Sequence, residues 1–332
     1  MSRIHVLAIG NALVDIIIPI DDKFIINNDI IKGGMTLIEN QQDLFNHKKA
    51  IISSGGSAAN TIAALANFGS KTSFIGKIAE DSLGHLFSND LQKEGVSYNT
   101  PPLLEKIDTG RSIIFITPDG ERSMNTYLGA SAQLNPKDIP VNQIENAQVT
   151  YLEGYLFDLY HGKEIIFLTA QTAHQHENII AMSLSDTLCI QRSRKDFLHL
   201  IRNNIVDILF ANEKEIMSLY KVHSIESALQ AIRQDSHNIV CITRAEKGAI
   251  IIQKQKIINI PPFSCINSIL DSTGAGDLYT AGFLYGYTHN FPLELSAKLG
   301  AFAGSLVIQQ IGSRLKYSLR DAAIQKGLIE SH

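Results

Sequence analysis

The pattern of apolar and polar positions along the chain becomes regular near residue 147. Short apolar segments then alternate with longer stretches whose apolar residues have helical spacing. These apolar segments lie at 149–152, 179–184, 208–211 and 239–243. Alternating strands and helices are typical of βαβ units, in which parallel strands form one sheet with helices on both faces. The pattern therefore predicts a doubly wound α/β core.

The chain before residue 147 predicts a smaller, β-rich part. Residues 112–117 and 122–127 flank Pro118-Asp119-Gly120, a turn sequence that favours a β-hairpin. We expect residues 1–332 to form one unit. Its small β-sheet lid is expected to come from about residues 12–50 and 108–128, and its α/β core from the remaining residues.

Composition and charge narrow the class of protein. The 332 residues are 45% hydrophobic and 19% charged, which is ordinary for a globular protein with a substantial core. The net charge of −4 argues against a nucleic-acid partner, because such binders usually carry a basic surplus. The apolar runs are too short to span a bilayer, and the N-terminus is typical of a first strand rather than a signal peptide. We expect a cytoplasmic protein without a membrane partner.

The three cysteines, Cys189, Cys241 and Cys265, lie far apart in apolar surroundings. They form neither a Cys-x-x-Cys pair nor a cluster at metal-binding spacing. We expect them to be buried, reduced thiols.

Candidate catalytic residues lie where a run of small residues precedes a predicted helix. Gly274-Ala275-Gly276 precedes Asp277 and an apolar helix that starts near Leu278. Free N–H groups at a helix start favour an anion, and small residues let a ligand approach the backbone. A carboxylate there can accept a proton from an alcohol while the N–H groups stabilise a transferring phosphoryl group. A plain glycine-rich turn capped by Asp277 is the alternative.

A second glycine turn, Gly55-Gly56, opens the helix that carries Asn60. Such a turn can admit a sugar ring against the backbone, and the Asn60 amide can bond hydroxyl groups. Asp15 is a lone carboxylate in an apolar run, so its charge needs a partner, which a vicinal diol would supply. A packing turn, a helix-surface asparagine and a structural turn carboxylate are the alternatives.

Asn212 and Glu215 follow the apolar segment 208–211. At the carboxyl end of a parallel strand, they fall on one face of a new helix, where they could hold a hydrated magnesium ion beside polyphosphate. An ordinary N-capped surface helix is the alternative.

Together these segments resemble the pfkB (ribokinase-like) carbohydrate and nucleoside kinases. Residues 271–277, Asp-Ser-Thr-Gly-Ala-Gly-Asp, match the C-terminal signature of that family. Residues 55–60 resemble its N-terminal signature, and residues 212–215 its Asn-x-x-Glu motif. The motifs fall in family order, and the likeness spans Val6 to about Ser313. The resemblance implies a ribokinase-like fold and an ATP-dependent kinase.

Within the family, residues 10–15, 32–38 and 117–126 resemble the bacterial adenosine-kinase-like branch. This resemblance implies that Asp15 binds ribose hydroxyls, and that Asp277 is the base beside an anion hole formed by Gly274, Ala275 and Gly276. It also implies that Arg122 reaches from the lid toward the phosphate. The residues expected around the sugar, besides Asp15, are Asn11, Gly55, Gly56 and Asn60.

The resemblance also implies where ATP, with Mg²⁺, would bind. The expected residues are Asn212, Glu215, Thr243 and Gly248. Ribokinase-like enzymes often bind a monovalent cation as well. Asp271, Thr273 and the segment 309–313 lie at matching positions, which makes a K⁺ site a hypothesis.

One departure bears on the substrate. Typical ribokinases carry Gly-Gly-Lys-Gly-Ala-Asn where residues 55–60 read Gly-Gly-Ser-Ala-Ala-Asn, so plain ribose is less favoured. Four apolar residues could line a purine pocket or could equally form the core of the lid: Met35, Leu37, Phe115 and Met124.

The expected activity is therefore phosphorylation of the 5′-hydroxyl of a purine nucleoside, with adenosine as the first choice. The main alternative is a sugar kinase that acts on ribose, fructose or a related sugar. A nucleotide-binding regulator with this fold is a second alternative, which the intact Gly-Ala-Gly-Asp and Asn-x-x-Glu motifs disfavour. A dehydrogenase is disfavoured because no Gly-x-Gly-x-x-Gly follows the first strand. The expected assembly is a monomer or a homodimer.

Overall fold

The computed structural model describes residues 3–39, 50–119, 121–236, 238–264 and 269–330. Within these residues, the larger of two sheets has the strand order β14-β13-β12-β11-β10-β9-β1-β5-β6. From β6 to β12 all neighbours are parallel, and β13 and β14 add an antiparallel hairpin at one edge. The strands are β1 (Ile4–Ile9), β5 (Thr72–Ile75), β6 (Ser97–Tyr98), β9 (Ala147–Leu152), β10 (Ile179–Ser183), β11 (Ile208–Asn212), β12 (Ile239–Thr243), β13 (Ala249–Gln253) and β14 (Lys256–Ile260).

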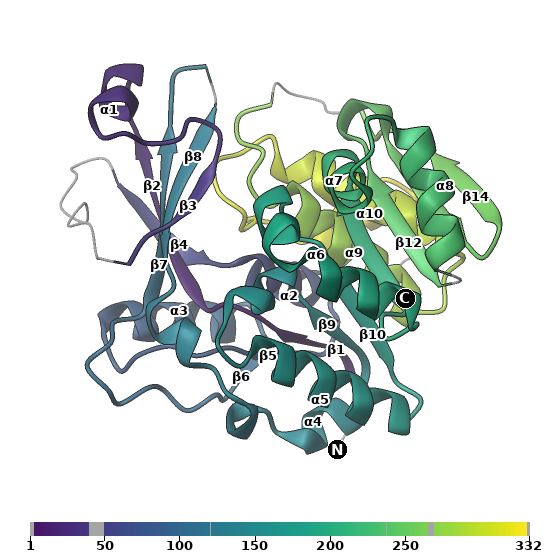
Figure 1. Ribbon diagram of the computed structural model, residues 1–332, viewed down its shortest axis with the longest axis horizontal. Helices are drawn as coiled ribbons and strands as arrows, with labels where there is room; N and C mark the ends of the chain where they lie inside the picture. Colours follow the sequence, from purple (N-terminus) through teal and green to yellow (C-terminus); the bar gives the residue numbers. More distant parts are fainter. Residues whose placement is uncertain (1–2, 40–49, 120, 237, 265–268, 331–332) are drawn as a thin grey trace.

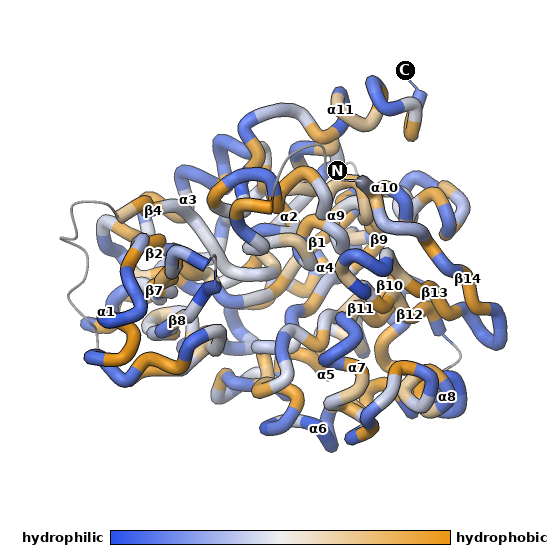
Figure 2. The backbone as a smooth tube through the Cα atoms, turned by 90° about the horizontal axis from the view of Figure 1, so that it is seen from above, coloured by the Kyte–Doolittle hydropathy of each residue, from blue (hydrophilic) through white to orange (hydrophobic). Residues whose placement is uncertain are grey.

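Helices cover both faces of this sheet (Figure 1). One face carries α2 (Ser57–Asn67), α3 (Ser82–Lys93), α9 (Ala275–Thr288), α10 (Leu293–Val307) and α11 (Leu319–Gln325). The other carries α4 (Val141–Glu145), α5 (Gly162–Gln175), α6 (Thr187–Arg202), α7 (Glu213–Tyr220) and α8 (Ile225–Asp235). Because successive strand residues point to opposite faces, Val6 and Ala8 enter one apolar cluster while Leu7 and Ile9 enter the other. In Figure 2 the apolar strands accordingly run through the middle of the molecule.

The smaller sheet stands to one side of the large one (upper left in Figure 1) and has the order β3-β8-β7-β2-β4. Its strands are β2 (Leu13–Pro19), β3 (Met35–Leu37), β4 (Ile51–Gly55), β7 (Gly110–Ile116) and β8 (Arg122–Tyr127). A short helix, α1 (Asp22–Asn27), covers its outer face, where Ile25 and Phe115 belong to a separate small core.

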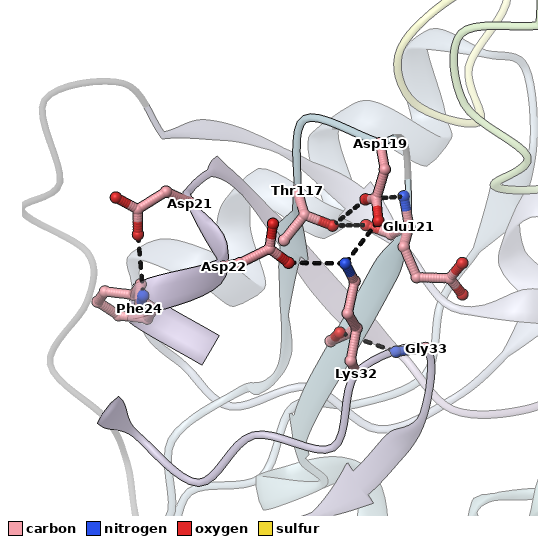
Figure 3. A network of polar contacts seen from close by, with 9 residues as sticks. Asp21, Asp22, Phe24, Lys32, Gly33, Thr117, Asp119 and Glu121 are labelled. Atoms are coloured by element: carbon pink, nitrogen blue, oxygen red, sulfur yellow. Dashed lines mark hydrogen bonds and ion pairs between the residues drawn. The ribbon is translucent and has the colours of Figure 1, made fainter. Parts of the chain in front are cut away.

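A polar network ties the outer end of this sheet together (Figure 3). The Lys32 ammonium pairs with Asp22 at 2.7 Å and with Asp119 at 2.5 Å. The Gly33 N–H donates to the Ser123 hydroxyl at 3.0 Å. The network therefore joins α1, the loop before β3 and the β7–β8 turn. Exposed ion pairs add little free energy, so we assign the network to fixing the loops rather than to overall stability.

The doubly wound core and the separate small sheet predicted from the sequence are confirmed. The predicted hairpin is present as β7 and β8, although its Gly120 lies outside the described residues. Strand β4 belongs to the small sheet, whereas the prediction limited the lid to about residues 12–50 and 108–128 and so placed Ile51–Gly55 in the core. The short elements α1, β6 and α11 were not predicted.

Cys189 and Cys241 are buried and free, as expected, and Cys265 lies outside the described residues. Among the helices that the structure describes, none combines the length and the apolar character needed to cross a membrane.

Candidate active site

Asp277 is the third residue of α9, and the backbone before it is shaped by glycine. Gly274 precedes the helix with φ of +76°, a conformation that glycine adopts readily. Within the described structure no side chain caps this helix start. A Cβ at Gly276 would meet no described atom within 4 Å, so the start of the helix is open. The first N–H groups of a helix lack intrahelical acceptors and can hold an anion here.

The Asp277 carboxylate is held by side chains of α2. The Ser57 hydroxyl donates to Oδ1 at 2.7 Å, and the Asn60 Nδ2 donates to Oδ2 at 3.0 Å. Burial raises the pKa of Asp277, while the bonds from Asn60 and Ser57 lower it. The two glycine motifs predicted from the sequence therefore meet at one carboxylate. Ser57 was not among the predicted site residues.

Asp15 lies on β2, so the small sheet contributes its own carboxylate. Its side chain is 6% exposed, and burial raises its pKa to about 7 against the opposing effects of Arg122 and Arg314. A Cβ at Gly55 would lie 2.1 Å from the Asp15 Cγ, so the carboxylate needs glycine at that position. Gly56 has φ of +89°, and a Cβ there would lie 2.4 Å from a backbone oxygen. The Gly55-Gly56 pair thus makes room for Asp15 and for the turn.

Asn11 is engaged by protein groups. Its backbone N–H and its Nδ2 both donate to Oε1 of Glu153 at 2.6 Å, and its Oδ1 accepts from the Ser131 hydroxyl. The other oxygen of Glu153 accepts from the Ala58 N–H at 2.9 Å. A contact between Asn11 and a sugar stays a prediction.

Glu153 is a site residue that the sequence reasoning missed. It is fully buried at the carboxyl end of β9, and burial raises its pKa to about 7. Through its bonds to Asn11 and Ala58, it pins the turn after β1 to the start of α2. A carboxylate directly after the apolar segment 149–152 was the signal available in the sequence.

Arg122 reaches from β8 to the loop before α9. Its Nε lies 3.2 Å from Oδ1 of Asp271, a carboxylate that is almost fully buried. The same Oδ1 accepts from the N–H and the hydroxyl of Thr273, and Oδ2 accepts from the Gly312 N–H at 2.9 Å. The ion pair links the small sheet to the loop that leads to Asp277.

The K⁺ hypothesis places its cation at Asp271 and Thr273. Donors from Thr273 and Gly312 already engage both oxygens of the Asp271 carboxylate, and the Arg122 guanidinium pairs with Oδ1. A cation in this loop would therefore depend mainly on backbone carbonyls. The site stays a prediction, which comparison of activity in Na⁺, K⁺ and a bulky organic cation tests.

The residues predicted for the nucleotide lie at the ends of β11 and β12. Asn212 and Thr243 are paired neighbours across these strands. Asn212 and Glu215 form a capping box: the Glu215 N–H donates to Asn212 Oδ1 at 2.8 Å, and the Asn212 N–H donates to Glu215 Oε2 at 2.9 Å. Burial raises the pKa of Glu215 to about 8. Gly248 has φ of +82° and shapes the turn that follows Thr243.

The predicted magnesium ligation at Asn212 and Glu215 stays a prediction, because the structure gives both side chains the capping role that was its alternative. Among the described residues no group of three or more His, Cys, Asp or Glu could hold a metal ion. A magnesium ion at Glu215 would thus need phosphate oxygens and water as its other ligands, which is usual for Mg²⁺ beside a nucleotide.

The register of the small sheet places two rows of side chains on the face that carries Asp15. The first row is Asp15, Ser112, Thr126 and Leu37, and the second is Ile17, Ile114, Met124 and Met35. Arg122 follows on the same face, because it lies two residues from Met124. Phe115 lies on the opposite face in the small core, so of its two predicted roles the structure supports lid core.

Comparison with known proteins agrees with this arrangement. Residues 31–319 match the model of the pfkB family carbohydrate kinases. The structure resembles a probable sugar kinase from Rhizobium etli CFN 42, with 45% identity, a TM-score of 0.94 and coverage of 99% of this chain and 100% of that one. It also resembles the adenosine kinase from Sinorhizobium meliloti, with 43% identity, a TM-score of 0.93 and coverage of 98% and 100%.

Among curated sequences, a 5-dehydro-2-deoxygluconokinase from Geobacillus thermodenitrificans is 27% identical over 264 residues, which cover 76% of this chain and 78% of that protein. The family match extends over most of the chain and includes the segments that form the Asp277 site. The chain belongs to the pfkB family of carbohydrate kinases and is a phosphotransferase that acts on an alcohol group.

Proposed function

We propose that this kinase transfers the γ-phosphoryl group of ATP to the 5′-hydroxyl of a purine nucleoside, with adenosine as the preferred acceptor. Asp277 orients the hydroxyl and accepts its proton. The N–H groups at the start of α9 and the Arg122 guanidinium stabilise the charge on the transferring group. ATP is the donor that membership of the kinase family implies, and bound Mg²⁺ would neutralise part of its phosphate charge.

The observation that carries this proposal is the face of the small sheet that bears Asp15. Its row with Asp15 offers a carboxylate for the two hydroxyls of a ribose, while the neighbouring row from Ile17 to Met35 is apolar. A nucleoside has both a diol and a flat, largely apolar base, so it matches two adjacent rows of this kind. The similarity to a protein named adenosine kinase, at 43% identity, supports the same assignment.

A sugar kinase is the second candidate. The 45% identical relative is named a probable sugar kinase, and the curated relative at 27% identity is named for a sugar-acid substrate. For such a substrate the apolar row would be packing surface of the small sheet only. Removal of its side chains would then leave the KM for the acceptor unchanged.

We also propose that the small sheet closes over the acceptor as a lid. The Arg122–Asp271 ion pair supports this role, because it joins the small sheet directly to the loop before α9. Exclusion of water by such a lid would limit wasteful hydrolysis of ATP. The assembly, monomer or homodimer, stays a prediction that light scattering of the purified protein tests.

The experiment is a coupled ADP-release assay with adenosine, guanosine, inosine, ribose and fructose as acceptors. The proposal expects the highest kcat/KM with a purine nucleoside. Thermal shift with the same panel separates binding from turnover, since only a ligand of the folded state raises the Tm. Turnover of ribose or fructose with no response to any nucleoside would assign the sugar kinase instead.

A further inference from the structure

The loop after α10, residues Gly312 to Arg314, contacts the Asp277 site from two sides. It bonds to Asn60 on α2 and to Asp271 in the loop before α9. Figure 1 shows this part of the chain passing between the large layer and the small sheet. The Ser313 hydroxyl donates to Oδ1 of Asn60 at 2.8 Å, in a bond that is buried. Arg314 Nη1 donates to the backbone oxygen of Ala59 at 2.8 Å and to that of Asn60 at 3.4 Å. One loop therefore forms hydrogen bonds with both the side chain and the backbone of Asn60.

The bond from Ser313 holds the Asn60 amide at its oxygen end, opposite the end that faces Asp277. An amide presents a donor at one end and an acceptor at the other. The ionised Asp277 carboxylate can only accept, so Nδ2 faces it and donates at 3.0 Å, and Oδ1 is left to accept from Ser313. A rotated amide would place its oxygen against the Asp277 carboxylate, where two acceptors repel each other. Asp277 thus selects the orientation of the Asn60 amide, and the buried bond from Ser313 holds the amide in place in that orientation.

Arg314 brings a positive charge to the site and forms a hydrogen bond with the small sheet. Its Nη2 lies 3.4 Å from the Ser54 hydroxyl on β4, and its Nε is buried with no hydrogen-bond partner among the described residues. The guanidinium lowers the pKa of both Asp15 and Asp277. Lysine could not reproduce the planar group, in which Nη1 donates to the Ala59 and Asn60 oxygens while Nη2 donates to the Ser54 hydroxyl.

We propose that Ser313 and Arg314 are positioning residues, which hold the Asn60 amide in the orientation that aims the Asp277 carboxylate at the acceptor hydroxyl. This inference rests on the proposed role of Asp277 as the base. It assigns Ser313 and Arg314 no contact with either substrate.

The test compares S313A with S296A in the ADP-release assay. Ser296 is a buried serine near the other end of α10, and within the part of the chain that the structure describes its hydroxyl bonds only to the backbone oxygens of Phe291 and Pro292, just before that helix. We expect S313A to lower kcat by up to about tenfold, the upper range for one ordinary hydrogen bond, with KM for the acceptor nearly unchanged. S296A should leave kcat unchanged. Equal kcat values for S313A and the wild type overturn the inference.

A double variant shows whether Ser313 acts through Asp277. In the D277N background the S313A change should have no further effect on the residual rate, because effects of groups that act through one another are not additive. The same loss in both backgrounds would mean that Ser313 acts independently of the base, which contradicts the inference. D277N alone reports on the base itself, so the two proposals can fail separately.

The pH profile of kcat gives a readout that a purely structural role would not move. Loss of the Ser313 bond weakens the Asn60 donor that lowers the pKa of Asp277, so the acidic limb of S313A should move to higher pH. R314K should move it less, because the positive charge remains. Titratable or charged groups that interact with Asp277 are Asp15 on β2, Arg122 on β8, Tyr151 on β9, Glu153 after β9, Glu215 on α7 and Arg314. An unmoved acidic limb in S313A contradicts the inference.

Discussion

Asn60 and Asp277 lie 217 positions apart in the chain, and the Asn60 Nδ2 donates to the Asp277 Oδ2 at 3.0 Å. This bond joins the starts of two helices, α2 and α9, each of which follows a glycine turn. The start of α9 has free N–H groups, which suit a transferring phosphoryl group, and α2 supplies the donors that hold its carboxylate. The relationship turns two separate glycine motifs into one site.

The D277N variant tests the base directly. An asparagine keeps the shape of the side chain but cannot take the proton of the acceptor hydroxyl. We expect kcat to fall by roughly two to four orders of magnitude, while binding of the acceptor changes little. Stopped assays of ADP release give the rate, and thermal shift gives the binding. Near-normal turnover in D277N would remove Asp277 from the mechanism.

The G55A variant tests whether the Asp15 carboxylate needs the space that glycine leaves at position 55. An added Cβ would lie 2.1 Å from the Asp15 Cγ, so the carboxylate must move. We expect KM for the acceptor to rise by about tenfold or more, as for loss of a hydrogen bond to a charged group. Because D15N removes the same interaction, the double variant should be little worse than either single one. Additive losses would show that Gly55 acts on something other than Asp15.

The buried Asp15 carboxyl predicts a pH dependence of stability. Burial raises its pKa to about 7 from an unfolded value of 3.8, so the folded state holds the proton more tightly. Its contribution to stability is therefore present at low pH and falls as the pH rises from about 4 to about 7. Without substrate, urea unfolding of D15N should lose less free energy over this range than the wild type. A steeper loss in D15N would contradict the raised pKa.

The Arg122–Asp271 ion pair predicts that R122A loses both catalytic rate and some stability. R122A removes a charge that we assign to the transferring phosphoryl group, so kcat should fall by about two to three orders of magnitude. Stability should fall only by about 1–3 kcal/mol, because Asp271 keeps its bonds from Thr273 and Gly312. Chemical denaturation measures the second quantity. A loss of stability with an unchanged rate would limit Arg122 to a structural role.

The sequence predicted the parts of the fold that rest on local pattern. The strand at 239–243 appears with the bounds expected, because a buried strand needs a continuous apolar run between polar segments. Strand β4 was assigned to the wrong sheet, since Ile51 and Ile52 do not reveal which strand they will pair with. Helix α1 has only six residues, too few for a helical period to stand out.

Site residues could be predicted where the neighbouring sequence marks them, but not where their role depends on tertiary contacts. Asp277, Asn60 and Asp15 sit beside glycines or in apolar runs, so their positions carried a signal. Ser57 is an ordinary serine in sequence and becomes a donor to Asp277 only when α2 meets α9. Arg314 likewise becomes part of the site only through its hydrogen bond to the backbone of Ala59, which lies 255 positions away in the sequence.

The most direct test of the central claim is kcat/KM for adenosine against ribose, measured by ADP release for the wild-type enzyme and for M124A. A nucleoside kinase that uses the apolar row predicts much faster turnover of adenosine. It also predicts a rise in KM for adenosine of about tenfold in M124A, from loss of contacts with the base. Faster turnover of ribose than of adenosine, with M124A unchanged toward ribose, would contradict the account.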